Sequence, residues 1–234
     1  MSERGTVILD LDGTLVDSAP DLADALDELL VERILAPIGL TGTRKLIGHG
    51  IANLVCKGLD LRGLRLTPRE LDRATDRFRE LYAKRLPAKA VAYPGVEQAL
   101  HQLKAQGWRL VVCTNKLEAF SRSILEGLGL ATFFEVIAGP DTFGVAKPDP
   151  LHLLRTLPSD CGPDYIAIMV GDSEVDVRTA QNAGLPVIAV SYGYAHVPLD
   201  TLKPNIILDH FADVPAAVER LAKISSSMKL EKAS

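Results

Sequence analysis

The sequence has few cysteines and no strong bias of charge. Its three cysteines, Cys56, Cys113 and Cys161, lie far apart in 234 residues and form no Cys-x-x-Cys pair. This usage is typical of a reduced, cytoplasmic protein and excludes a disulfide scaffold or a cysteine-rich zinc site. The net charge is −4, with 26 Lys and Arg against 30 Asp and Glu, and no block of like charge stands out. We therefore expect no nucleic acid among its partners.

Long apolar runs are absent as well. The most apolar segments, such as Thr6–Leu9 and Tyr165–Val170, have the length of a β-strand. They fall far short of the roughly 18 consecutive apolar residues of a membrane span. The first five residues lead directly into a strand-like run, which is not the pattern of a secretory signal. We expect a cytoplasmic globular protein with no membrane partner.

Short runs rich in Val, Ile and Leu recur along the chain, at residues 6–9, 109–113, 135–138, 165–170, 187–190 and 205–208. Most are apolar throughout, as expected for strands that are covered on both faces of a parallel sheet. Segments with helical spacing separate them, and three of these stop at Gly107, Gly129 and Gly184, a residue type that favours helix ends. The pattern predicts an α/β fold with a doubly wound, mainly parallel, Rossmann-like sheet.

One connection is too long for this pattern. Between the first strand and the second, the helix at 95–106 is a sufficient crossover, so residues 18–86 are surplus. Helical spacing within them predicts helices at about 21–34, 43–59 and 67–84. We expect a small helical cap domain at 18–86, inserted into a catalytic core made of residues 1–17 and 87–234. Hinges are expected near residues 17–20 and 86–94.

The strongest motif is Asp-Leu-Asp-Gly-Thr at residues 10–14, where the first strand ends. Ligands of parallel α/β sheets bind beyond the carboxyl ends of the strands, so Asp10 and Asp12 lie where chemistry is expected. An exposed Asp-Gly turn would explain Asp12 but not a carboxylate that ends an apolar strand. A buried, unpaired Asp10 would be costly, and a cation would relieve that cost.

A second acidic motif supplies a partner for that cation. Gly-Asp-Ser at 171–173 follows another core strand, and Asp176 lies one helical turn after Asp172. Neighbouring strand ends are about 4.8 Å apart, so Asp10 and Asp172 can reach one ion. Because all candidate ligands are oxygens, Mg²⁺ is favoured over zinc or copper. Asp172 as a simple helix N-cap is the alternative.

Two weaker motifs follow other strands. Thr114 and Asn115 come after the strand that ends at Cys113, where a helix N-terminus favours anions, although N-capping is the commoner reason for such residues. Lys147 precedes a Pro-Asp-Pro turn that opens a helix and fixes the direction of the lysine. A lone loop lysine is usually solvated, so its interest depends on the other motifs.

Taken in chain order, these four motifs resemble those of the haloacid dehalogenase-like hydrolase superfamily, and the inserted helices resemble its small helical cap. Within that superfamily, phosphoglycolate phosphatases are the most similar, on four further segments. These segments cover residues 46–54, 92–96, 147–153 and 191–194. The resemblance implies a Mg²⁺-dependent phosphatase acting on a small phosphorylated metabolite, with 2-phosphoglycolate the first candidate, as a monomer or homodimer.

The chemistry of the residues and the resemblance together suggest roles. Asp10 is expected to be the nucleophile that forms an aspartyl-phosphate, and Asp12 the general acid and base. Lys147 adds positive charge near the phosphoryl oxygens, and Asp10 and Asp172 hold the Mg²⁺. The resemblance assigns a third metal ligand to the Asp12 backbone carbonyl and phosphate binding to Thr114 and Asn115. It further implies supporting roles for three residues, Thr14, Ser173 and Asp176.

Substrate selection is expected in the cap loop of Gly48, His49 and Gly50. Glycines let backbone N–H groups approach a small anion such as a carboxylate, and His49 could donate another hydrogen bond. The simpler interpretation is a helix-starting turn with an exposed histidine.

Other reactions stay open at this point. A dehalogenase would not need Asp12, because halide leaves without a proton, but a sugar-phosphate phosphatase, a pyrophosphatase or a phosphosugar mutase would share most of these motifs. A phospho-accepting signalling domain also has an aspartate at a strand end. It lacks the second carboxylate two residues later and the helical insert.

Overall fold

The computed structural model describes residues 4–159, 161–162 and 165–233. Its main sheet has six parallel strands in the order β5-β4-β1-β6-β7-β8. They are β1 (Thr6–Leu9), β4 (Arg109–Cys113), β5 (Val136–Ala138), β6 (Ala167–Gly171), β7 (Val187–Val190) and β8 (Ile206–Leu208). Each overlaps a run of apolar residues in the sequence, so the predicted parallel α/β sheet is confirmed.

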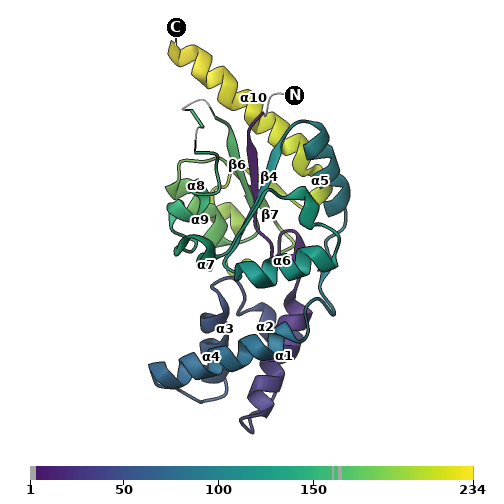
Figure 1. Ribbon diagram of the computed structural model, residues 1–234. Coiled ribbons are helices and arrows are strands. Elements are labelled where there is room, and N and C mark those ends of the chain that lie inside the picture. Colours follow the sequence, from purple (N-terminus) through teal and green to yellow (C-terminus); the bar gives the residue numbers. More distant parts are fainter. Residues whose placement is uncertain (1–3, 160, 163–164, 234) are drawn as a thin grey trace.

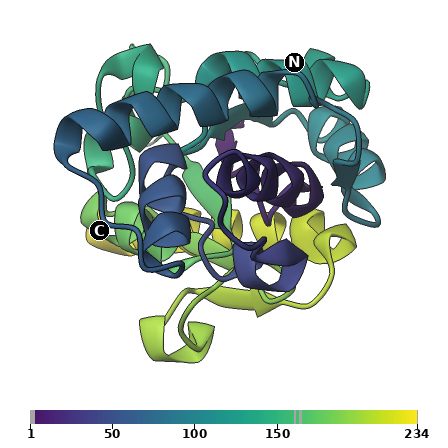
Figure 2. The same cartoon turned by 90° about the horizontal axis from the view of Figure 1, so that it is seen from below.

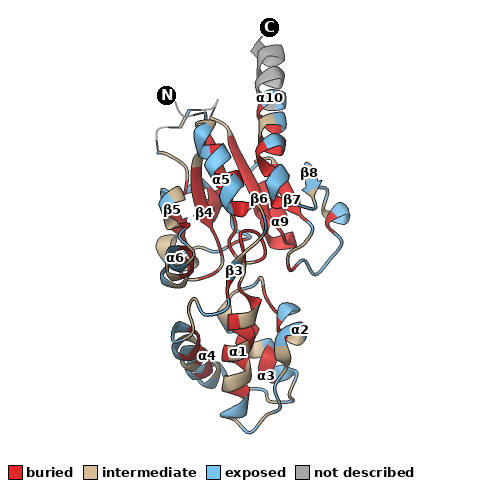
Figure 3. Cartoon of the chain, turned by 90° about the vertical axis from the view of Figure 1, so that its right-hand side faces the viewer, coloured by how far each residue is buried: buried red, intermediate tan, exposed pale blue. Residues whose placement is uncertain are grey.

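Helices cover both faces of this sheet. One face packs against α5 (Val96–Ala105), α6 (Glu118–Gly127) and α10 (Val214–Ala233), and the other against α8 (Pro150–Leu154) and α9 (Glu174–Asn182). Strand residues alternate between the two cores: Val7 and Leu9 face the first, whereas Ile8 faces the second. Buried residues therefore fill the central strands β4, β1, β6 and β7 along almost their whole length (Figure 3), which explains why these runs are not amphipathic. The edge strand β8 has no buried residue.

The surplus residues form four helices at one end of the molecule, away from the projecting end of α10 (Figure 1). We call α1 (Ala19–Val31), α2 (Gly39–Arg44), α3 (Ile51–Asp60) and α4 (Pro68–Ala83) the cap helices. Seen from their end, they lie in front of the core (Figure 2). Three of them, α1, α3 and α4, share a hydrophobic cluster in which Leu26, Leu29, Val55 and Phe78 are fully buried. The domain boundaries at 17/18 and 86/87 stay predictions.

The expected single helix at 43–59 is wrong. The structure divides it into α2 and α3, joined by residues 45–50. Gly48 (φ +118°) and Gly50 (φ +82°) adopt backbone conformations outside the helical range, which residues with a side chain rarely adopt. The break places a loop, rather than a continuous helix, against the core.

Two short strands connect the cap helices to the core. Strand β2 (Val16–Asp17) pairs antiparallel with β3 (Val91–Ala92), so the two expected hinge segments lie side by side. The fully buried Asp21 of α1 accepts hydrogen bonds from the backbone N–H groups of Lys89 and Ala90, at 3.0 and 2.9 Å. These contacts tie the start of the first cap helix to the chain segment that returns to the core.

The remaining elements are short. They are η1 (Ala131–Phe133), α7 (Pro140–Phe143), η2 (Leu199–Leu202) and η3 (Phe211–Asp213). Within the described ranges, no helix combines the length and apolarity needed to cross a bilayer.

Candidate active site

A cavity lies between the carboxyl ends of the central strands and the cap helices. Its core wall contains nine residues: Asp10, Asp12, Thr114, Asn115, Lys116, Lys147, Asp172, Ser173 and Tyr194. Its cap wall contains Leu22, Ile47, Gly48, Gly50, Ile51 and Leu54. The structure thus brings together all four motifs that the sequence analysis selected, from four separate positions along the chain.

Asp10 follows β1 directly and is 7% exposed. One of its carboxylate oxygens, Oδ1, lies 2.8 Å from the Nζ atom of Lys147. Burial raises the pKa of Asp10 to about 7, although the Lys147 ammonium opposes this shift, and the nearby acids Asp176 and Asp12 add to it. In the absence of a further cation, the ionised form of Asp10 is therefore destabilised.

Asp172 follows β6, the strand next to β1, and is 1% exposed. Its carboxylate accepts hydrogen bonds from the Thr14 hydroxyl at 2.9 Å and from the Tyr194 backbone N–H at 2.6 Å. Burial, together with the charges of Asp176 and Asp10, raises the pKa of Asp172 well above its ordinary value. Gly13 and Gly193 flank this carboxylate so closely that a Cβ atom at either position would overlap it.

Asp176 holds the parts of the site together. Its Oδ1 accepts a hydrogen bond from Lys147 Nζ at 2.6 Å, and its Oδ2 accepts hydrogen bonds from the backbone N–H and the hydroxyl of Ser173, at 3.0 and 2.7 Å. Burial lowers the pKa of Lys147, but the carboxylates of Asp10 and Asp176 outweigh burial and raise it above its ordinary value. Lys147 therefore stays protonated between two acids.

These acids fit a divalent cation. Carboxylate oxygens of Asp10, Asp172 and Asp176 lie within 4.8 Å of one another, and all three residues are buried. Lys147 forms ion pairs with two of these carboxylates, those of Asp10 and Asp176. Burial, together with repulsion between the neighbouring acids, raises the pKa of Asp10 and of Asp172. An all-oxygen ligand set with this charge suits a hard cation such as Mg²⁺.

Asn115 contacts the Lys147 loop as well as lining the cavity. Its Oδ1 accepts a hydrogen bond from the Lys147 backbone N–H at 2.9 Å, and its Nδ2 donates to the Lys147 carbonyl at 3.1 Å. The same amide donates to the Gly48 carbonyl of the cap loop at 3.4 Å. Asn115 thus positions Lys147 and contacts the cap loop, and its expected phosphate contact, like that of Thr114, stays a prediction.

Lys116 is a residue that the sequence analysis missed. It is 5% exposed, and its Nζ lies 2.7 and 3.0 Å from the two carboxylate oxygens of Asp12 and 4.9 Å from the ring centre of Tyr82 in α4. Burial lowers the pKa of Lys116, but Asp12 and Tyr82 outweigh burial and raise it. In the sequence, the only feature that could have identified Lys116 as a site residue is its position directly after Thr114 and Asn115.

Asp12 has a second partner in the Ser18 hydroxyl, which donates a hydrogen bond to it. Ser18 precedes α1, so this contact joins the candidate acid to the start of the cap helices. Tyr194 makes a parallel link, because its hydroxyl donates to Asp17 at 2.6 Å while its backbone holds Asp172. No sequence pattern predicts a role for Tyr194, which in the structure connects Asp172 with Asp17 of β2.

The cap loop is only partly in the cavity. Gly48 and Gly50 line it, as expected for residues that contact a substrate. The His49 side chain, which is 41% exposed, lies instead against Glu174, outside the set of lining residues. Its expected role in substrate binding stays a prediction.

Comparison with known proteins places this geometry in a family. Residues 7–190 match the family model described as haloacid dehalogenase-like hydrolase. A phosphoglycolate phosphatase of Mesorhizobium japonicum is 39% identical over 208 residues, covering 89% of this chain and 92% of the relative. A phosphoglycolate phosphatase of Rhodospirillum rubrum is 43% identical, covering 89% and 88%.

Among solved structures, one described as a predicted phosphoglycolate phosphatase from Haemophilus somnus superimposes with a TM-score of 0.82. It is 31% identical and the match covers 92% of this chain and 97% of the other. The likeness therefore includes the cap helices as well as the sheet.

Proposed function

Because the chain belongs to the haloacid dehalogenase-like hydrolase family, we propose that it is a Mg²⁺-dependent phosphatase that converts 2-phosphoglycolate to glycolate and phosphate. The observation that carries this proposal is the pair Asp10 and Asp12 at the end of β1, facing one cavity together with Lys147 and Asp172. The named activity of several relatives at 36–43% identity supports the choice of substrate.

Asp10 is the nucleophile in this proposal. A carboxylate oxygen of Asp10 attacks phosphorus, the bond from phosphorus to the ester oxygen breaks, and an aspartyl-phosphate forms. Asp12 gives a proton to the departing alkoxide. In the second step a water molecule attacks phosphorus, Asp12 takes the proton of that water, and phosphate leaves with Asp10 restored.

The metal would be held by Asp10, Asp172 and the backbone carbonyl of Asp12. When bound, Mg²⁺ offsets the negative charge on the phosphoryl oxygens and on the attacking carboxylate. Lys147 adds fixed positive charge next to Asp10, and Asp176 keeps its ammonium in place.

Lys116 suits the carboxylate of 2-phosphoglycolate. Its ammonium group lines the cavity next to Asp12, so a small substrate with its phosphate at Asp10 would bring a second anion within reach of Lys116. A substrate carboxylate would compete with Asp12 for Lys116 and leave Asp12 freer to carry the proton that the alkoxide needs. The Gly48–Gly50 loop offers backbone N–H groups to the same end of the substrate.

A panel of phosphate monoesters tests the proposal. Release of inorganic phosphate would be measured with 2-phosphoglycolate, hexose phosphates, phosphoserine and pyrophosphate, with and without Mg²⁺. We expect kcat/KM for 2-phosphoglycolate to be at least about 100-fold higher than for the others. A higher value for a hexose phosphate or for pyrophosphate would identify a sugar phosphatase or a pyrophosphatase, and isomerised product without net phosphate release would identify a mutase.

Location in the cytoplasm and assembly as a monomer or homodimer stay predictions. Size-exclusion chromatography with light scattering would determine the assembly.

A further inference from the structure

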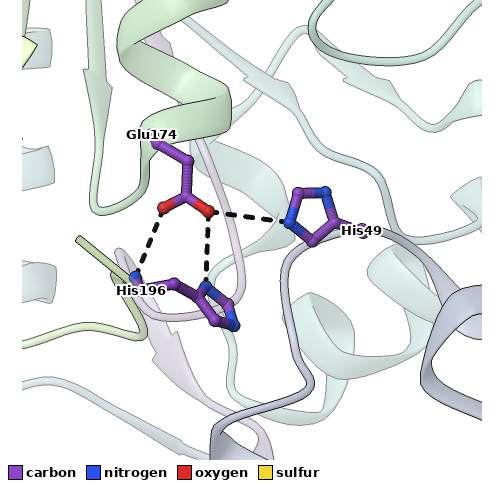
Figure 4. A group of neighbouring side chains, drawn as sticks. All are labelled: His49, Glu174 and His196. Carbon is purple, nitrogen blue, oxygen red and sulfur yellow. Dashed lines mark hydrogen bonds and ion pairs between the residues drawn. The ribbon is translucent and has the colours of Figure 1, made fainter. Parts of the chain in front are cut away.

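A second group of metal-ligating side chains lies outside the all-oxygen site. His49 comes from the loop between α2 and α3, Glu174 from the first turn of α9, and His196 from the segment after β7 (Figure 4). The group therefore joins a cap loop to two parts of the core. One ligand atom from each residue lies within 4.8 Å of the others.

The distances within the group match ligands of one ion better than hydrogen bonds. His49 Nε2 lies 3.6 Å and His196 Nδ1 lies 3.4 Å from the same Glu174 oxygen, Oε1. Both separations exceed the 2.7–3.2 Å of an ordinary N–H···O hydrogen bond. Ligand atoms that surround a tetrahedral ion at about 2.0–2.1 Å are about 3.3 Å apart.

The tautomer of His196 supports the same conclusion. Its Nε2 lies 3.0 Å from the backbone carbonyl of Lys45, and a carbonyl only accepts, so Nε2 carries a hydrogen and donates it. In the neutral ring, Nδ1 then has no hydrogen and directs its lone pair toward the Glu174 carboxylate. A cation between these two electron-rich atoms would stabilise the arrangement. Histidine ligands commonly donate their other N–H to a backbone carbonyl in this manner.

We propose that His49, Glu174 and His196 form a second metal site, for a borderline transition-metal ion such as Zn²⁺. Two imidazole nitrogens and one carboxylate suit Zn²⁺, whereas Mg²⁺ prefers the oxygen ligands of Asp10 and Asp172. The His49 side chain is 41% and the His196 side chain 26% exposed, which leaves room for water in a fourth position. The ion would hold the cap loop to the core.

The consequence for catalysis rests on the proposed function. If the cap helices move during each turnover, an ion that bridges His49 and His196 slows that movement and lowers kcat. Zn²⁺ at this site would thus act as an inhibitor that leaves the Mg²⁺ ligands untouched.

Co²⁺ is the probe that tests the site, because tetrahedral and five-coordinate Co²⁺ absorb visible light and Zn²⁺ does not. The full chain, freed of metals and then saturated with Mg²⁺, would be titrated with Co²⁺. We expect one equivalent to bind with these visible bands, and Zn²⁺ to abolish them. His196→Ala and His49→Ala should each weaken Co²⁺ binding by more than about 100-fold, the upper end of the cost of losing outer-shell partners.

His101→Ala is the matched control, because it removes an exposed imidazole of α5, away from the group. It should bind Co²⁺ as the unmodified protein does. Thermal unfolding without Co²⁺ verifies that each variant is folded, and the exposed position of His49 favours this for at least one variant.

Absence of visible bands in the Mg²⁺-saturated protein would overturn the proposal, and so would equal Co²⁺ binding by His196→Ala and His49→Ala. Neither result depends on substrate, so a failure of the metal site is distinguishable from a failure of the proposed phosphatase activity. Conversely, inactivity toward every phosphate ester would leave the spectroscopic result unaffected.

Discussion

The two walls of the cavity differ in chemistry. The core wall has acids and lysines in the loops that follow the strands, among them Asp10, Asp172 and Lys147, each at most 7% exposed. The cap wall has aliphatic side chains, such as Ile51 and Leu54, and two loop glycines. In the proposed mechanism, bond making and breaking therefore belong to the core, while the cap excludes water and limits the size of the substrate. Substitutions in the two walls test this division, and those in the core wall are expected to have the largest effects.

Asp10→Asn should remove the nucleophile while keeping the shape of the side chain. We expect kcat for 2-phosphoglycolate to fall by at least about 10⁴-fold, as for other nucleophile substitutions, measured by phosphate release. Asp72→Asn, an exposed change on α4, is the control and should have ordinary activity. Substantial activity of Asp10→Asn would show that Asp10 is not the nucleophile and would contradict the placement of the chemistry in the core wall.

Lys116→Met should affect recognition of the substrate carboxylate. Loss of this buried ammonium should lower kcat/KM for 2-phosphoglycolate by about 10²-fold, the expected order for a buried charge pair. A phosphate ester without a carboxylate should lose clearly less. Lys57→Met, at an exposed position of α3, is the control. Equal losses for both esters would show that Lys116 serves Asp12 alone.

Mg²⁺ binding should weaken in acid. Burial raises the pKa of Asp10 to about 7 in the metal-free protein, and only the ionised carboxylate binds the metal, so protons compete with Mg²⁺ below that pH. The fraction of ionised Asp10 falls about tenfold between pH 8 and pH 6. Calorimetric titration should show affinity at least about tenfold weaker at pH 6, because Asp172, the other carboxylate ligand, also has a raised pKa. A pH-independent affinity would contradict the assigned ligands.

Ile51→Ser should let water into the cap wall without touching the acids. We expect kcat to fall by a few-fold, roughly 3–10, because the apolar wall strengthens the electrostatic interactions at the phosphate. Leu61→Ser, at a residue of the same region that is 58% exposed, should leave kcat unchanged. A loss as large as that of Asp10→Asn would mean that the cap takes part in the chemistry itself.

Most of the core and of its site residues could be predicted from the sequence. Apolar strands end in Asp10, Asp172 and Thr114, and parallel strands bring their carboxyl ends to one edge, so the convergence of these residues was predictable. The cap helices were harder to predict, because they bury their apolar faces against each other. Only Gly48 and Gly50 marked the division between α2 and α3 in the sequence.

Contacts between segments that are distant in the chain could not be predicted from sequence patterns. The ion pair of Lys116 with Asp12 joins two loops of the core, and the contact of His49 with His196 depends on how the cap loop packs against the core. Neither shows a periodicity, since the partners lie on different elements far apart in the chain. Asn115 illustrates a subtler case, because its type predicted an anion contact while its amide holds the Lys147 loop.

The most direct test of the central claim is to trap the phosphoryl group on the protein. Enzyme mixed with radiolabelled 2-phosphoglycolate would be quenched in acid within milliseconds, digested and mapped. The proposed mechanism predicts label on the peptide that contains Asp10, with more label in Asp12→Asn if that variant still forms the intermediate. Phosphate released at full rate with no labelled protein at any time would contradict it.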